Sequence, residues 1–311
     1  MTPENKSTQK PELDARTFQN KLGLLATTIA LKVQREAAQL GFKPAFAIAD
    51  IYFLLRQAQQ TYSTFFFMNA DERREKDVDW RPAYSVVMLP LVRTMIDCLY
   101  NVTAILKNPG VNGHLFRASG YRLMLESLDR DALRYGGDPK WDEWIARQRQ
   151  MIDFDMRANG FTEIEVRSSK ALWPTLGRYL YVSPSNTPSP HQEFLKKLTL
   201  GFWQEYSGIS HATFQGLLPI AVFLAPNDLP HEDRPKIDDT FETVLSIHMP
   251  RVCAILLCIL TETQAYFRFD GANINKRLHE IWNALILAPE IKELHDERYS
   301  NLMKEKGINP E

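Results

Sequence analysis

The segment 82–107 reads PAYSVVMLPLVRTMIDCLYNVTAILK. Drawn as a helix, it is apolar almost all the way round, which is typical of a helix enclosed by other helices. Before and after it, apolar residues recur at intervals of three and four, the spacing of one helix face. We therefore expect an all-α fold, a multi-helix bundle in which the 82–107 helix is central.

Turn-forming residues predict where these helices begin and end. Glycine and asparagine suit helix C-termini because they adopt the left-handed conformation at little cost. The expected ends are Gly41, Gly136-Gly137 and Asn159-Gly160. Ser189 followed by Gln192 is a capping-box pattern, which predicts a helix from there to about Phe214.

The segment 161–190 is the one region without clear helical periodicity. The alternating Ile164 and Val166 favour a short strand, and the letters SPSNTPSP at 183–190 favour a long Pro- and Ser-rich loop. We expect residues 1–12 to form a flexible tail and residues 13–311 to form a single helical domain. If that domain is subdivided, the border is expected within 161–190.

Composition and charge argue against several classes of protein. Lys and Arg number 37 against 38 Asp and Glu, so a net charge of −1 gives no global attraction to nucleic acid or acidic lipid. Cys98, Cys253 and Cys258 lie in apolar segments without CxxC spacing, which predicts reduced, buried thiols. No secretory signal is visible, and the most apolar run, 252–260, is too short to span a membrane. We expect a cytoplasmic protein that binds neither nucleic acid nor a membrane.

The sequence lacks the motifs that would identify a catalytic or cofactor site. It has no GxxxxGK[ST] or GxGxxG loop, no HExxH motif, and no histidine with glutamate three or four residues before it, as a di-iron bundle requires. The letters GISHA at 208–212 approach a nucleophile elbow, but the residues before them predict a helix where an elbow needs a strand. We therefore expect no metal and no cofactor.

Two expected helices carry polar residues one turn apart on an apolar background. Arg93 and Asp97 are four residues apart, with Asn101 another four on, and Ser207 and His211 are four residues apart on the later helix. Burying arginine and aspartate costs free energy unless they are paired or bind a ligand. These side chains therefore need partners.

Two interpretations of Arg93, Asp97, Ser207 and His211 stay open. In the structural one, an Arg–Asp pair fixes the helix register and the histidine is a satisfied core residue. In the functional one they form a catalytic or binding pocket, in which Arg93 binds an anion and His211 moves a proton. Asp97 would orient Arg93 or His211, and Ser207 would hydrogen-bond His211 or the ligand. Arg117 could close such a site around Arg93.

A second polar set lies on the long helix expected over about 237–267. It consists of Glu242, Ser246, His248 and Arg251. His248 and Arg251 share a helix face, whereas Ser246 and His248 cannot. Next to Pro250 this set predicts either a water-filled site or the polar side of a structural helix.

The letters RTMIDCLYN at 93–101 and YSGISHATFQG at 206–216 resemble two landmarks of uncharacterised bacterial all-helical domain proteins. Those proteins are similar to the HEPN-like helical domains of phage-defence and toxin systems. The family pattern has glutamate where this chain has Asp97, and its tyrosine is shifted relative to Tyr206. The resemblance implies an all-α, cytosolic bacterial protein. HEPN-type ribonucleases carry an arginine five to seven residues before the histidine, and no histidine of this chain has one.

Two functions are compatible with these observations. The first is a cytosolic helical-bundle protein with a binding or regulatory role, which associates with a protein partner or with itself and takes a small anionic ligand. The alternative is a HEPN-like enzyme that acts on a phosphodiester or on RNA, with Arg93 and His211 as its working pair. The enzyme requires these two side chains to converge, although they come from different helices.

Overall fold

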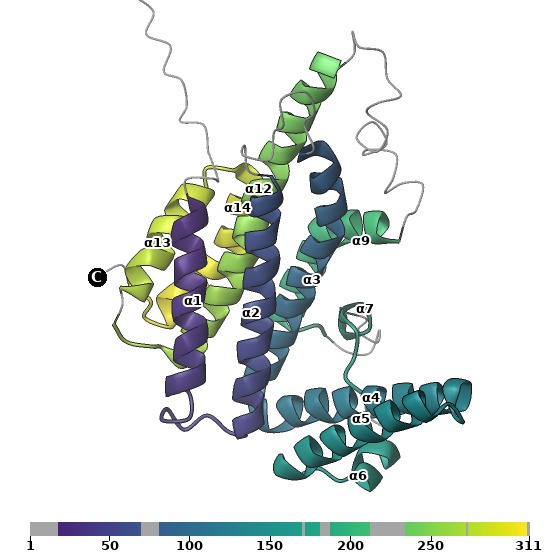
Figure 1. Ribbon diagram of the computed structural model, residues 1–311. Helices are drawn as coiled ribbons and strands as arrows, with labels where there is room; N and C mark the ends of the chain where they lie inside the picture. The colour runs from purple at the N-terminus through teal and green to yellow at the C-terminus, as the bar shows by residue number, and fades with distance from the viewer. Residues whose placement is uncertain are drawn as a thin grey trace, which may run out of the picture. The chain divides into compact units, whose positions relative to one another are not determined.

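The structure is a computed structural model that describes residues 18–69, 81–169, 172–180, 187–211, 234–271 and 273–309. Within these ranges the chain is 84% helical and has no strand, so the prediction of an all-α multi-helix fold is confirmed. The longer helices are α1 (Gln19–Glu36), α2 (Ala45–Met68), α3 (Arg81–Lys107), α4 (His114–Tyr135), α5 (Pro139–Ala158), α12 (Arg234–Phe267) and α13 (Ile274–Leu285) (Figure 1). The expected tail at 1–12 lies outside the described residues.

Shorter helices fill the intervals between the long ones. They are α6 (Glu163–Ser168), α7 (Leu176–Leu180), α8 (Pro190–Leu198), α9 (Gln204–Ser210), α14 (Pro289–Leu294) and α15 (Ser300–Glu305). Three π-helical segments continue into them or into α4: η3 (Pro109–Gly113), η4 (Thr199–Trp203) and η8 (His295–Tyr299).

The chain divides into two compact units. Unit 1 takes residues 1–31, 55–99 and 188–311, and unit 2 takes residues 32–54 and 100–187. The border at 187/188 falls within the 161–190 segment. The other borders fall inside α1, α2 and α3, so each of these helices contributes residues to both units. A continuous helix carries no turn signal, and the sequence therefore does not indicate these borders.

The core of unit 1 surrounds α12. Every residue from Val252 to Ala265 is buried, and α13, α14 and α15 pack against this helix. The hydroxyls of Thr261 and Thr263 in this stretch donate to backbone carbonyl oxygens one turn earlier. The predicted central helix, α3, is also largely buried, and its most enclosed residues include Val92, Met95, Ile96 and Leu99.

Two helical segments are long and apolar enough to cross a membrane by length and composition. They are Met88–Lys107 and Leu245–Phe267, and 67% and 83% of their qualifying windows are buried inside the protein. A core helix covered by other helices has the same properties. These segments are therefore weak evidence for a membrane location.

Unit 2 is built around the hairpin of α4 and α5, against which α6 packs (Figure 1). Asp138 caps α5 through its carboxylate, which accepts from the backbone N–H of Lys140 at 2.9 Å, and Pro139 occupies the first helical position. The hydrophobic core of this part consists of Ala118, Tyr121, Leu125, Leu128, Ile152, Met156, Phe161 and Val166.

The prediction of a short strand at Ile164 and Val166 is wrong, because both residues belong to α6. Thr162 and Glu165 form a reciprocal capping box at the start of this helix, which satisfies backbone N–H groups locally. Val166 is buried in the core of unit 2, whereas Ile164 is 81% exposed. The spacing of two apolar residues was too short a pattern to distinguish a strand from one helical turn.

The capping box at Ser189 and Gln192 is confirmed at the start of α8. The helix expected to continue to about Phe214 is helical from Pro190 to Ser210, as α8, η4 and α9 in direct succession. Residues 183–186 of the Pro- and Ser-rich stretch and residues 212–214 lie outside the described part of the chain.

The α4–α5 turn depends on glycine at position 137, where φ is +95°. Gly137→Ala should lower the free energy of unfolding by about 1–2 kcal/mol, because a Cβ is disfavoured at positive φ. Gly120→Ala is the control: an added Cβ meets no atom within 4 Å in the middle of α4, and the change should stabilise by about 0.5–1 kcal/mol. Denaturant unfolding followed by circular dichroism measures both, and equal effects would contradict this role for Gly137.

Candidate functional site

Arg93 and His211 meet at the surface of unit 1. Arg93 Nη1 lies 3.1 Å from the hydroxyl oxygen of Ser210 and 3.1 Å from Nε2 of His211. Arg93 is half-buried on α3, and Ser210 and His211 are exposed at the C-terminal end of α9. The fold therefore brings an arginine and a histidine from separate helices within hydrogen-bond distance.

The last turn of α9 holds Ser210 and His211 in place. The backbone N–H of His211 donates to the carbonyl oxygen of Ser207 at 3.0 Å, and the hydroxyl of Ser210 donates to the same oxygen at 3.2 Å. With its hydrogen used in this way, the Ser210 oxygen accepts from Arg93. One carbonyl group thus organises both residues that contact the guanidinium.

The contact between Arg93 and His211 determines which ring nitrogen carries a proton. Arginine has only N–H donors, so Nε2 of His211 accepts this bond and carries no hydrogen. By this assignment the imidazole is neutral and its proton is on Nδ1. As arranged, Nε2 has no lone pair left for a substrate.

The structure gives the hydroxyl of the site to Ser210, a residue that the sequence analysis did not select. Ser207, which was selected, is buried and contributes its backbone carbonyl oxygen. The clue available in the sequence was the position of Ser210 directly before His211. Asp97 is half-buried one turn after Arg93, and its orienting role stays a prediction.

Asn101, the third polar residue of this row, is used in unit 2. Its side-chain oxygen accepts from the indole N–H of Trp173 at 2.8 Å. This residue therefore has a packing role within that unit, and nothing links it to the contacts of Arg93.

The second polar set holds α9 against α12. His248 Nδ1 lies 3.1 Å from the hydroxyl of Tyr206, and Arg251 donates to Glu205 at 2.8 Å and to Glu290 of α14 at 2.9 Å. Burial, with a further contribution from the Arg251 charge, lowers the pKa of His248 to about 4, so this histidine is neutral at pH 7. His248 and Arg251 are therefore structural and position the helix that ends at Ser210, whereas Ser246 is exposed and the side chain of Glu242 lies outside the described part of the protein.

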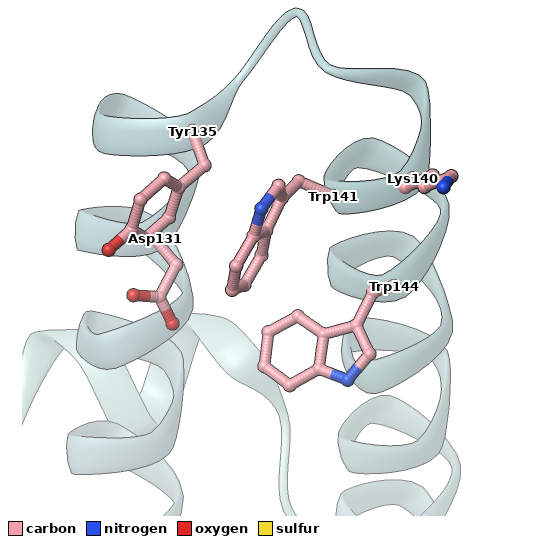
Figure 2. Close-up of a pocket in the computed structure, with 5 residues that line it drawn as sticks. All are labelled: Asp131, Tyr135, Lys140, Trp141 and Trp144. Carbon is pink, nitrogen blue, oxygen red and sulfur yellow. The ribbon is translucent and has the colours of Figure 1, made fainter.

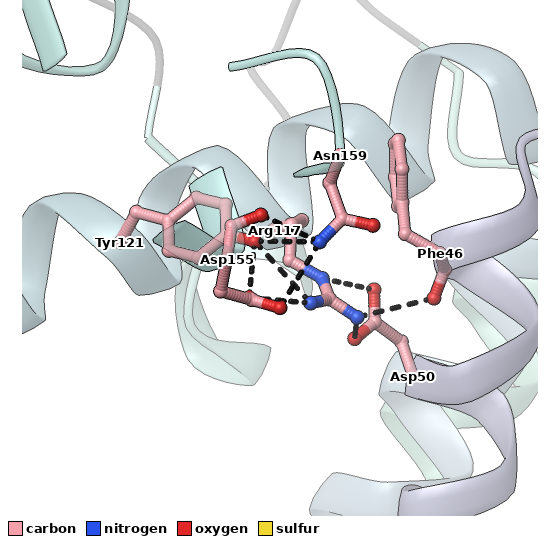
Figure 3. A network of polar contacts seen from close by, with 6 residues as sticks. All are labelled: Phe46, Asp50, Arg117, Tyr121, Asp155 and Asn159. Carbon is pink, nitrogen blue, oxygen red and sulfur yellow. Dashed lines mark hydrogen bonds and ion pairs between the residues drawn. The ribbon is translucent and has the colours of Figure 1, made fainter. Parts of the chain in front are cut away.

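Arg117 occupies a separate polar network within unit 2 (Figure 3). Its guanidinium pairs with Asp50 at 2.7 Å and with Asp155 at 3.2 Å, and it donates to the carbonyl oxygen of Phe46 at 3.2 Å. The hydroxyl of Tyr121 also donates to Asp155 at 2.6 Å. These partners join α2, α4 and α5. Arg117 therefore has a structural role in unit 2, whereas the sequence suggested that it could close a site around Arg93.

A pocket of about 570 Å³ lies on the α4–α5 hairpin of unit 2 (Figure 2). Asp131 and Tyr135 line it from α4, and Lys140, Trp141 and Trp144 line it from α5. The sequence analysis did not find this pocket. The available signal was the pair of tryptophans three residues apart, directly after a glycine turn that folds them back toward Tyr135.

The remaining candidate chemistry is structural in the described part of the chain. Cys98, Cys253 and Cys258 are free and buried as predicted, and burial raises the pKa of each thiol to about 12, so none is a ready nucleophile. Among the described residues no group of three or more His, Cys, Asp or Glu side chains is placed to hold a metal ion.

Comparison of the chain with protein-family models, curated proteins and solved structures gives no match. The resemblance to bacterial HEPN-like helical domains therefore stays a prediction.

His248 should make stability depend on pH. Its folded pKa of about 4 lies below the value of about 6.5 expected in the unfolded chain, so the unfolded state binds more protons. This contribution to stability is present above pH 6.5 and is lost as the pH falls toward 4, which amounts to about 2 kcal/mol between pH 7 and pH 5.

Denaturant unfolding at pH 7 and pH 5 tests this expectation. His248→Gln should reduce the pH-dependent loss by about 2 kcal/mol, whereas the control Lys276→Gln changes an exposed side chain of the same unit and should leave it unchanged. A His248→Gln protein with the full loss would show that another group is responsible.

Proposed function

We propose that the protein is a cytoplasmic binding or regulatory protein that recognises an anionic group, of the phosphate or sulfate type, at Arg93, Ser210 and His211. The observation that carries this proposal is the contact of Arg93 Nη1 with both Ser210 and His211 at the protein surface. An arginine, a hydroxyl and an imidazole placed together are suitable donors for the oxygens of such an anion.

Binding would place an anion against Arg93 where Ser210 and His211 now accept. In the free protein the guanidinium donates to a neutral hydroxyl and a neutral imidazole, and the hydroxyl donates to a backbone carbonyl. Charge-assisted hydrogen bonds to an anion are roughly twice as strong as neutral ones.

The protonation of His211 supports binding rather than base catalysis. A general base must present a free lone pair to the proton that it abstracts. In the arrangement described, Nε2 accepts from Arg93 and Nδ1 carries the proton, so His211 would have to leave Arg93 before it could act as a base. To bind an anion, Arg93 needs only to redirect its N–H donors from Ser210 and His211 to the oxygens of the anion.

The second candidate function is a HEPN-like enzyme that cleaves a phosphodiester bond. The same convergence of Arg93 and His211 favours it, because arginine can stabilise charge on a phosphoryl group while histidine transfers a proton. This alternative requires substrate binding to separate the two side chains by the width of a phosphate group.

The cytoplasmic location and the association with a protein partner or a second copy of the chain are further parts of the proposal. Burial of most of the two apolar helical segments is compatible with a protein that is not inserted in a membrane. Size-exclusion chromatography with light scattering would test self-association, and a strict monomer would count against it.

Sulfate binding tests the proposed function directly. Calorimetric titration should give binding that weakens about tenfold in Arg93→Gln, because a charged hydrogen-bond donor is lost. His211→Ala, which removes a second hydrogen-bonding group of the site, should also weaken sulfate binding.

The control for this titration is Lys276→Gln, which removes an exposed positive charge of the same unit and should leave sulfate binding unchanged. Equal losses in Lys276→Gln and Arg93→Gln would show non-specific attraction and refute the site. Incubation of the wild-type protein with RNA distinguishes the alternative: cleavage that disappears in His211→Ala would establish the enzyme.

A further inference from the structure

The pocket on the α4–α5 hairpin is lined by three aromatic rings in two different orientations. Tyr135 and Trp141 are stacked, with ring centroids 4.3 Å apart and an interplanar angle of 15°. Trp144 stands nearly at right angles to Trp141, at 5.6 Å and 80°. Trp141 is 39% exposed and Trp144 is 43% exposed, so both indoles remain accessible to a ligand.

The stacked pair fixes one wall of the pocket. The guanidinium of Arg134 lies 5.7 Å from the centroid of Tyr135 and so already makes a cation–π contact with this ring. With Arg134 and Trp141 both against it, Tyr135 acts as a positioning residue that orients Trp141. Trp141 and Trp144 are left as the rings that can face a ligand.

The pocket also contains a carboxylate that the protein does not neutralise. Among the described residues, Asp131 makes no ion pair or side-chain hydrogen bond, although arginines elsewhere on this hairpin pair with Asp129 and Glu143. Figure 2 shows the Asp131 carboxylate directed into the space between α4 and α5, toward Trp144. The ammonium group of Lys140 points away from that space, so this lysine does not neutralise Asp131.

We propose that this pocket binds a quaternary ammonium group, held by the indoles of Trp141 and Trp144 and by the charge of Asp131. The inference goes beyond the proposed function, because all of its residues lie in unit 2 whereas Arg93, Ser210 and His211 lie in unit 1. The volume of about 570 Å³ is within the range of small-molecule sites.

The chemistry of the pocket favours this ligand over other cations and over anions. A quaternary ammonium spreads its charge over methyl groups, which lose little hydration on contact with an indole face and also gain apolar contact. A sodium ion or a primary ammonium is strongly hydrated and needs several oxygen ligands, whereas most of this lining is aromatic carbon and its oxygen groups are the Asp131 carboxylate and the Tyr135 hydroxyl. An anion would be repelled by Asp131 and by the negative faces of the rings.

Calorimetric titration of the full chain with choline and with 3,3-dimethylbutan-1-ol tests the proposal. The second compound has the shape of choline with carbon in place of nitrogen, so it reports apolar contact alone. Choline should bind at least about fivefold more tightly, which is the range of a partly exposed cation–π contact. Equal affinities, or no binding of choline, would overturn the proposal and leave an apolar groove.

Two substitutions and one control locate the binding. Trp144→Leu and Asp131→Asn should each weaken choline binding about five- to tenfold. Asp153→Asn makes the same chemical change elsewhere on α5, where Asp153 pairs with Arg157, and should have no effect. Unchanged unfolding midpoints would show that the variants fold, and choline binding that survives Trp144→Leu would refute the site.

The source of the quaternary ammonium is distinguished in the same experiment. A peptide with trimethyllysine and its unmethylated counterpart are titrated alongside choline. Tighter binding of the trimethylated peptide than of choline would assign a modified protein partner, and tighter binding of choline would assign a small molecule or headgroup. Equal binding of the two peptides would contradict recognition of the quaternary group.

Discussion

Enclosure of α12 is the constraint on which unit 1 depends. No residue between Val252 and Ala265 is exposed, so its polar groups need partners inside the protein. Thr261 and Thr263 bond to their own helix, and Glu262 pairs with Arg298 of η8. Nearer the start of the same helix, His248 and Arg251 hold α9 through Tyr206 and Glu205. The position of Ser210 and His211 beside Arg93 is therefore a consequence of how the core helix satisfies its polar side chains.

Partners within the protein separate structural polar groups from candidate functional ones. Arg117, Arg251 and Arg298 are each held by carboxylates, and removing either member of such a buried pair would leave an uncompensated charge. Arg93 contacts the Ser210 hydroxyl and the His211 imidazole at the surface, and the proposed anion site rests on these contacts. Asp131 is a carboxylate in an aromatic pocket, and among the described residues no cation lies against it.

Much of the fold could be predicted from local pattern. Apolar periodicity identified the helices, and the signals at Ser189, Gly137 and Asn159 identified several of their ends. The pattern failed at Ile164 and Val166, because two alternating residues fit one helical turn as well as a strand and the capping box of Thr162 decided the outcome. The helix expected after Ser189 runs without interruption from Pro190 to Ser210 and includes the π-helical segment η4. Three borders between the two units lie inside α1, α2 and α3 and have no local signal, whereas the border at 187/188 lies in the 161–190 segment.

The sequence by itself determined the all-α class, the buried state of the cysteines and the choice of Arg93 and His211, because apolar spacing and rare polar residues on an apolar helix are properties of a single segment. Only the tertiary structure decided which hydroxyl accompanies them, that His248 is an uncharged core residue, and that Trp141, Trp144 and Asp131 share a pocket. Those outcomes depend on contacts between segments that are distant in the sequence or folded back across a turn. The periodicity of one segment does not predict which residues of another segment will contact it.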